Sequence, residues 1–260
     1  MKLVGLTVEN FRCYSAPISV RFGNLTALVG RNDVGKSTLM DALAVFFEAA
    51  KPDKDDACKS GDPKHMRITC EFDSTPSGLI VDTDFPTTLL AEHLLGPTGN
   101  LVIQKTYNGS IGTPSVTSIV ALAEHPTVEG YNDLLSLKKT ELAKRAADLG
   151  VDLDGIDKRV NALVRAAIWA SCADLKKAEV AVPLDAEGGK QVWAALQRRC
   201  CTTQSTEDSH RESKRLDGAH EQTDTRPLPH DELVQLHSVA AQARITADLA
   251  GQGHDLARVA

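Results

Sequence analysis

One short loop constrains this chain more than any other feature. Residues 30–37, Gly-Arg-Asn-Asp-Val-Gly-Lys-Ser, fit the pattern G-x-x-x-x-G-K-[ST] at each fixed position. The apolar run of residues 25–29 predicts a strand buried on both faces, and residues 35–50 predict a helix that ends before Pro52. The predicted core face of that helix carries Leu39, Leu43, Phe46 and Phe47. A strand, a glycine-rich loop and a helix in this order form a P-loop.

Each residue type in the loop has a chemical reason for its position. Glycine lets the backbone approach phosphate oxygens without a Cβ in the way. Successive N–H groups and the start of the helix then form an anion-binding concavity. Lys36 is expected to reach the β- and γ-phosphates, Ser37 to bind Mg²⁺ and Thr38 to contact the α-phosphate side. The sequence therefore predicts that ATP with Mg²⁺ binds at Gly30, Asn32, Asp33, Val34, Gly35, Lys36, Ser37 and Thr38.

Hydrolysis would also need a carboxylate near the metal ion and a residue that positions water. The apolar run of residues 78–81 ends in Asp82, with Asp84 close behind. Asp82 is therefore a candidate for the magnesium-binding aspartate that follows a Walker B strand. The alternative is that Asp82 only ends a strand, at a turn over residues 82–86. The sequence identifies no catalytic residue.

Composition narrows the class of protein. The chain has 260 residues, of which 42% are hydrophobic, so it can build a core. Its net charge of -6 argues against a wholly basic nucleic-acid-binding surface. It has no signal-peptide h-region near Met1 and no apolar run of about 18 residues, so we expect a cytoplasmic protein without a membrane span. Six cysteines without CxxC spacing suit a reducing cytosol; they are Cys13, Cys58, Cys70, Cys172, Cys200 and Cys201.

The pattern along the chain predicts three regions. A core lobe over residues 1–125 would hold the P-loop and antiparallel strands at 2–9, 18–22, 66–72, 78–81 and 101–107. A helical region over 126–197 would carry amphipathic helices at 131–149 and 156–175. The fold class is therefore α/β: a P-loop NTPase resembling an ABC-ATPase head, with an antiparallel β lobe and a helical insertion.

The third region, residues 198–260, is polar. From Arg198 to Arg226 apolar residues are too few to offset the entropy of ordering the chain, although residues 230–250 could form a terminal helix. Five histidines in this region have no metal-binding spacing. We expect a truncation or a shift of reading frame near Arg198, which translating the gene's other frames would test.

The opening of the chain resembles the ATPase heads of the RecF/SMC group, and most closely OLD-family ATP-binding proteins. The matching residues are Leu6-Thr7-Val8-Glu9-Asn10-Phe11-Arg12 and those from Leu28 to Leu43. Weaker similarity continues through residues 135–150 and 182–193. The resemblance implies that Arg12 lies near the nucleotide and that two heads form a homodimer around ATP. It also implies a role in DNA repair or phage defence, with DNA and a nuclease domain or partner protein as candidate partners.

The chain also departs from the pattern of these heads. A signature helix, a Walker B strand, a switch histidine and a Toprim nuclease domain are not recognisable, and residues 187–191 are interpreted as a loop before a helix. Two alternatives stay open: a nucleotide-binding module without turnover, and another P-loop NTPase, such as a GTPase or small-molecule kinase. The sequence contains no Asn-Lys-x-Asp guanine motif, which argues against the GTPase. A basic cluster lies on residues 131–149 and comprises Lys138, Lys139, Lys144 and Arg145. It is either a candidate contact for DNA or a solvated helix face.

Overall fold

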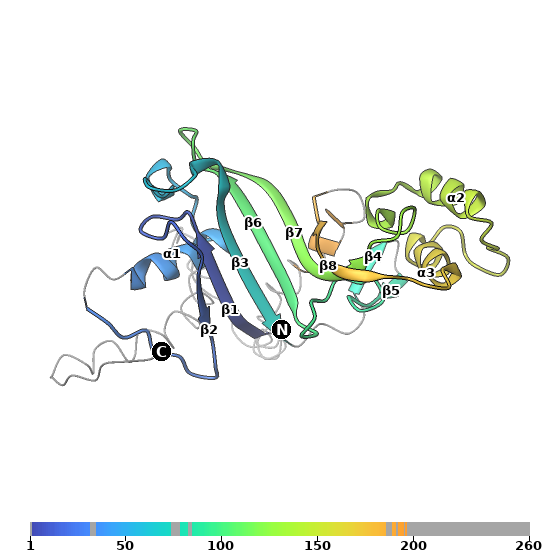
Figure 1. Cartoon of the computed structure of the whole chain (residues 1–260), viewed down its shortest axis with the longest axis horizontal. Coiled ribbons are helices and arrows are strands. Elements are labelled where there is room, and N and C mark those ends of the chain that lie inside the picture. The colour runs from blue at the N-terminus through green and yellow to red at the C-terminus, as the bar shows by residue number, and fades with distance from the viewer. Residues whose placement is uncertain are drawn as a thin grey trace, which may run out of the picture. The chain divides into compact units, whose positions relative to one another are not determined.

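A mixed α/β architecture is observed, with one six-stranded antiparallel sheet and few helices. The computed structural model describes residues 2–31, 35–73, 79–82, 85–185, 189–190, 192–194 and 196. The strands of the large sheet follow the order β2-β1-β3-β6-β7-β8 (Figure 1). Their bounds are β1 Lys2–Glu9, β2 Ile18–Arg21, β3 Met66–Asp73, β6 Leu101–Asn108, β7 Ser115–Pro126 and β8 Lys177–Pro183. The strands predicted at 2–9, 18–22, 66–72 and 101–107 are confirmed, whereas β7 and β8 were not predicted.

Alternation of apolar and polar residues explains the central strands. In β3 the side chains of Met66, Ile68, Cys70 and Phe72 are buried, and each residue between them is half-buried. Successive side chains of a strand point to opposite faces of a sheet, so this pattern buries one face and leaves the other partly in water.

The described residues fall into two compact units. The α1 unit contains Val4–Ile68 and Thr106–Val116, and the α3 unit contains residues 2–3, 69–105 and 117–196. In the α1 unit, helix α1 (Lys36–Phe46) is followed by the 3-10 turns η1 (Lys54–Asp56) and η2 (Pro63–His65). Helix α1 ends four residues earlier than predicted. Its core face includes Leu39, Leu43 and Phe46, but Phe47 is exposed, which corrects the prediction for that residue.

The strand predicted at residues 25–29 does not form. Leu25 and Val29 are 67% and 76% exposed, and the segment has no strand hydrogen bonds. After β2, the Gly23 N–H donates to the Thr26 hydroxyl at 2.9 Å, which closes a local turn. An apolar run forms a buried strand only when neighbouring strands accept its backbone hydrogen bonds, and none is adjacent to it among the described residues.

In the α3 unit, helices α2 (Lys139–Asp148) and α3 (Asn161–Ser171) pack against each other (Figure 1). Both are shorter than predicted. A 3-10 turn η3 (Leu134–Ser136) precedes α2, and the Lys138 N–H donates to the carboxylate of Glu141 at 2.8 Å, which fixes the start of the helix. Strand β4 (Leu79–Asp82), predicted at 78–81, pairs antiparallel with β5 (Phe85–Thr87) in a separate two-stranded sheet.

A buried ion pair ties α3 to the segment after β5. Arg165 and Glu92 are each 1% exposed and form two hydrogen bonds of 2.9 Å, and the Thr87 hydroxyl donates to the same carboxylate at 3.1 Å. Removing one partner of such a pair leaves an uncompensated buried charge. The α3 unit therefore depends on both residues.

We expect Glu92→Gln to lower the free energy of unfolding by about 3–5 kcal/mol, because the Arg165 charge loses its partner. The double variant Glu92→Leu/Arg165→Met should recover much of this loss. Urea denaturation followed by circular dichroism measures both changes. As a control, Asp174→Asn removes an exposed ion pair with Lys176 and should change the free energy of unfolding by about 1 kcal/mol or less. If Glu92→Gln lowered the free energy of unfolding no more than Asp174→Asn does, the argument would be contradicted.

The α3 unit also contains a cluster of three rings. The His93 ring lies 4.8 Å from that of Trp169 and 6.3 Å from that of His125, measured between centroids. The Nδ1–H of the buried His125 donates to the carbonyl of His93 at 3.0 Å. Burial, followed by the nearby charges of Lys177 and His125, lowers the pKa of His93 to about 4. Burial also lowers the pKa of His125, despite the opposing effect of Glu92.

These shifts predict that acid destabilises the α3 unit. The unfolded chain takes up a proton at His93 near the ordinary pKa of 6.5, and the folded chain only near 4. Stability is therefore lost as the pH falls from 6.5 to 4. We expect His93→Asn, which tolerates the positive φ of 54° at this position, to reduce the fall in Tm over this interval relative to pH 8. An unchanged fall would show that His93 does not titrate in this way.

Candidate functional site

The lysine of the predicted P-loop is held by the loop itself. Lys36 Nζ donates to the carbonyl oxygens of Gly30 and Arg31 at 2.6 and 2.7 Å. Asn32, Asp33 and Val34, which were also predicted to contact the nucleotide, lie outside the described residues. The ammonium group is thus bonded to two carbonyl groups that an anionic oxygen could replace.

The N-terminus of α1 fits a polyphosphate. Gly35 occupies the N-cap position with φ 87°, and no side chain caps the helix in the described part of the chain. The first turn of the helix contains no acidic residue that would repel an anion. Ser37 is exposed and Thr38 is buried. Free N–H groups, the positive end of the helix dipole and a nearby ammonium are the features that bind phosphate.

A four-residue turn near the amino terminus of the chain contacts α1 and the residue before it. Phe11 and Tyr14 exchange backbone hydrogen bonds of 3.0 and 2.9 Å. The three residues after Phe11 each contact α1: Arg12 pairs with Asp41, the Cys13 thiol lies 3.8 Å from the Thr38 hydroxyl, and the Tyr14 hydroxyl donates to the Gly35 carbonyl at 3.1 Å. We call residues 11–14 the N-terminal turn.

Two carboxylates hold Arg12. Its Nε donates to Asp56 at 2.7 Å, and its Nη1 donates to Asp41. Burial lowers the pKa of Arg12, but the hydrogen bonds to Asp56 and Asp41 outweigh that effect and raise the pKa above its ordinary value. Arg12 is therefore a fixed cation next to α1. Its backbone is in the left-handed region, with φ 49°.

The segment after α1 forms a wall facing the N-terminal turn. The Arg12 N–H donates to the Asp56 carbonyl at 2.7 Å, and the Cys58 N–H donates to the Asn10 carbonyl at 3.0 Å. The Asn10 side-chain amide also donates to the His65 carbonyl at 3.0 Å. At the far end, the Gly109 N–H donates to the Pro63 carbonyl at 2.7 Å. These bonds fix residues 53–65, which we call the wall segment.

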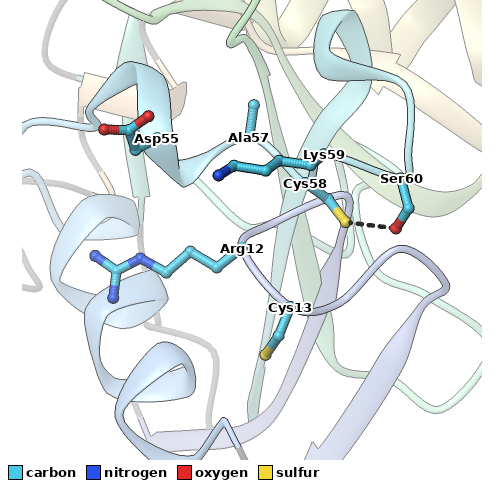
Figure 2. A pocket seen from close by; sticks show the side chains of 7 residues that line it. All are labelled: Arg12, Cys13, Asp55, Ala57, Cys58, Lys59 and Ser60. Carbon is cyan, nitrogen blue, oxygen red and sulfur yellow. Dashed lines mark hydrogen bonds between the residues drawn. The ribbon is translucent and has the colours of Figure 1, made fainter.

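A cavity of about 520 Å³ separates the two segments. Figure 2 shows Arg12 and Cys13 from the N-terminal turn opposite residues of the wall segment, with the Cys58 thiol and Ser60 hydroxyl 3.3 Å apart. The lining residues are Arg12, Cys13, Asp55, Ala57, Cys58, Lys59 and Ser60. The cavity has the size of a small-molecule pocket, and Arg12 and Cys13 reach both it and α1.

Other predicted residues lie elsewhere. Asp82 ends β4 in the two-stranded sheet of the α3 unit, and its role as a magnesium ligand stays a prediction. In the predicted basic cluster, Arg145 donates to both oxygens of Asp133, at 2.7 and 2.9 Å, and to the Gly130 carbonyl. This pairing offsets the charge of Arg145 within the cluster.

Sequence reasoning identified Arg12 but missed its partners. Asp41 lies within the quoted resemblance, but it is 29 residues from Arg12, and no helical spacing links the two. Asp56 is separated from Arg12 by 44 residues, so no spacing rule predicts that pair. Cys13 and Tyr14 were also missed, because a turn has no periodicity that points to its neighbours.

The comparisons with known proteins give one match. The model of a family described as AAA ATPase domain matches residues 1–226, and so includes the first part of the polar region. No curated protein matches the chain. Within the described residues, no helix has the length and apolar character needed to cross a membrane.

Gly35 provides a test of the contact between the N-terminal turn and α1. A Cβ at Gly35 would collide with the Tyr14 hydroxyl and lie 2.8 Å from the Cys13 sulfur, at a φ that L-residues rarely adopt. We expect Gly35→Ala to lower the free energy of unfolding by about 1–3 kcal/mol. The matched control is Gly30→Ala, whose Cβ would meet, among the described residues, Lys36 Nζ alone, at 3.9 Å. Equal denaturation curves for the two variants would contradict the packing described here.

Proposed function

Because the chain belongs to the AAA ATPase domain family, we propose that it binds ATP with Mg²⁺ at the N-terminus of α1. An AAA ATPase domain implies nucleotide binding with a divalent metal ion. The observation that carries the choice of site is the uncapped start of α1, with the Lys36 ammonium held beside it. Membership of this family also supports the assignment to the P-loop NTPases.

Each residue of the site has a proposed role. Lys36 exchanges its bonds with the Gly30 and Arg31 carbonyls for bonds with phosphate oxygens, since a charged phosphate oxygen attracts the ammonium more strongly than a neutral carbonyl does. The N–H groups of Gly35, Ser37 and Thr38 bind the same oxygens, and the Ser37 hydroxyl holds Mg²⁺, which supplies charge neutralisation when bound. Asn32, Asp33 and Val34 would complete the loop, and Asp82 remains the proposed second metal ligand.

The cavity offers a place for the nucleoside. Arg12 and Cys13 border both the cavity and α1, so a nucleotide with its phosphates at α1 could extend its ribose and base toward the wall segment. There, Ser60 supplies a hydroxyl, and Asp55 and Lys59 supply one charge of each sign. This lining is suited to the hydroxyl and ring-nitrogen groups of a nucleoside.

More specifically, we propose that the chain is an ATP-binding head of the OLD/RecF-like type, on the basis of the resemblance at residues 6–12 and 28–43. Its organisation would be a core lobe over 1–125 and a helical region over 126–197, followed by a tail. A homodimer of heads, DNA, a nuclease domain or partner protein, a cytoplasmic location, and a role in DNA repair or phage defence rest on that resemblance. Sedimentation of the protein with and without ATP tests the dimer: a monomeric mass under both conditions would exclude it.

A second candidate function is nucleotide binding without turnover. Of the two carboxylates that pair with Arg12, the buried Asp56 is bonded through both oxygens, so it is engaged rather than free to coordinate a metal ion. Measuring phosphate release separately from ATP binding distinguishes the two functions. Release that disappears in the Lys36→Ala variant would favour an ATPase.

We expect MgATP at 100 times its Kd to stabilise the wild-type chain by about 2.7 kcal/mol. The variant Lys36→Ala loses the charge-assisted bonds to phosphate, so we expect its ATP affinity to fall about 10- to 100-fold. Thermal denaturation with titrated MgATP, together with calorimetry, measures both effects, and MgGTP in parallel tests the GTPase alternative.

Lys64→Ala is the matched control, because Lys64 is an exposed lysine on η2 of the same unit. It should bind ATP as the wild type does. If folded wild-type protein takes up no nucleotide, or if Lys36→Ala binds ATP as tightly as Lys64→Ala, the proposed site is wrong.

A further inference from the structure

Resting on the proposed ATP site, we infer that Asp56 is a positioning residue that presents the Arg12 guanidinium to the nucleotide, while Asp41 is the partner that the nucleotide replaces. The two carboxylates hold the same side chain, but their surroundings differ. The side chain of Asp56 is 6% exposed, and that of Asp41 is 46% exposed.

Hydrogen bonds hold both the side chain and the backbone of Asp56. Its Oδ1 accepts from Arg12 Nε at 2.7 Å, and its Oδ2 accepts from the Asp53 N–H at 2.7 Å, in the capping box of η1. Its carbonyl accepts from the Arg12 N–H at 2.7 Å. A buried carboxylate with these bonds cannot leave Arg12 without a large desolvation cost. Asp56 therefore sets where Nε lies.

Asp41 is held more loosely. It lies on the surface of α1 and contacts the other end of the guanidinium at Nη1. An exposed ion pair contributes little, because water solvates both charges when the pair breaks. An incoming phosphate can therefore replace Asp41 as the partner of Nη1 while Asp56 keeps Nε in place.

The guanidinium geometry permits this exchange. Arginine has five N–H donors in a planar fork that matches phosphate oxygens. The bonds to Asp56 and Asp41 use Nε and Nη1, and within the described part of the chain the other donors of the fork are left for a phosphate. The ring of Phe11, 5.4 Å from the guanidinium carbon, also restrains it. One lysine ammonium could not bond Asp56 and a phosphate in the same way.

The test is a double-variant cycle on the Kd for MgATP, measured by calorimetry. We expect Arg12→Ala to weaken binding about tenfold and Asp56→Asn to weaken it by a smaller factor. The double variant should bind as Arg12→Ala does, because Asp56 acts only through Arg12. Asp41→Asn should bind ATP as tightly as the wild type or more tightly. Asp62→Asn, an equal loss of charge in the wall segment without contact to Arg12, should match the wild type.

The cycle separates positioning from a merely structural role. A structural defect would lower affinity equally in the wild-type and Arg12→Ala backgrounds, and that result would overturn the inference. So would an Asp41→Asn variant that weakens binding as much as Asp56→Asn does. If Asp56→Asn does not fold, Arg12→Lys takes its place: we expect it to bind about as weakly as Arg12→Ala, and wild-type affinity would overturn the inference. Loss of binding in Lys36→Ala, measured alongside, shows that the ATP site itself is intact as proposed.

Discussion

The contact between the N-terminal turn and helix α1 is the interaction on which the site depends. The turn closes on itself through the paired backbone bonds of Phe11 and Tyr14, and the buried Phe11 anchors it. Arg12 has a left-handed backbone, a conformation that costs about 1–3 kcal/mol and persists only where the surroundings fix it. Here the surroundings are α1 on one side and the wall segment on the other, so the strained residue joins the two.

That contact also explains how α1 can keep an uncapped N-terminus. Most helices satisfy their first N–H groups with a side chain, and losing such a cap costs about 1 kcal/mol. Helix α1 is instead fixed by its buried residues Leu39, Leu43 and Phe46 and by the bonds from Tyr14 and Arg12. Because the helix is held from its side, it does not depend on a side-chain cap from the described residues, and in the proposed site its N–H groups would bond a ligand.

The sequence predicted the features that local rules control. Alternating burial in β3 and the glycine-rich loop before α1 follow from side-chain period and backbone freedom. Whether residues 25–29 form a strand could not be predicted in this way. A buried strand needs a neighbouring strand to pair with, and the apolar run does not show whether one is present. The pairs Arg12–Asp56 and Arg165–Glu92 join residues 44 and 73 positions apart, and only the three-dimensional fold brings such charges together.

Both cations of the site are already bonded before any ligand arrives. Lys36 is bonded to two carbonyls, and Arg12 to two carboxylates. In the proposed site, binding a phosphate would exchange one set of oxygens for another at both cations. The exchange lowers the net gain, because the broken bonds must be subtracted, but it keeps the cations in place. A small anion that reaches only one of them gains from a single exchange, whereas a polyphosphate that reaches both gains twice, so this arrangement favours ligands with several phosphates.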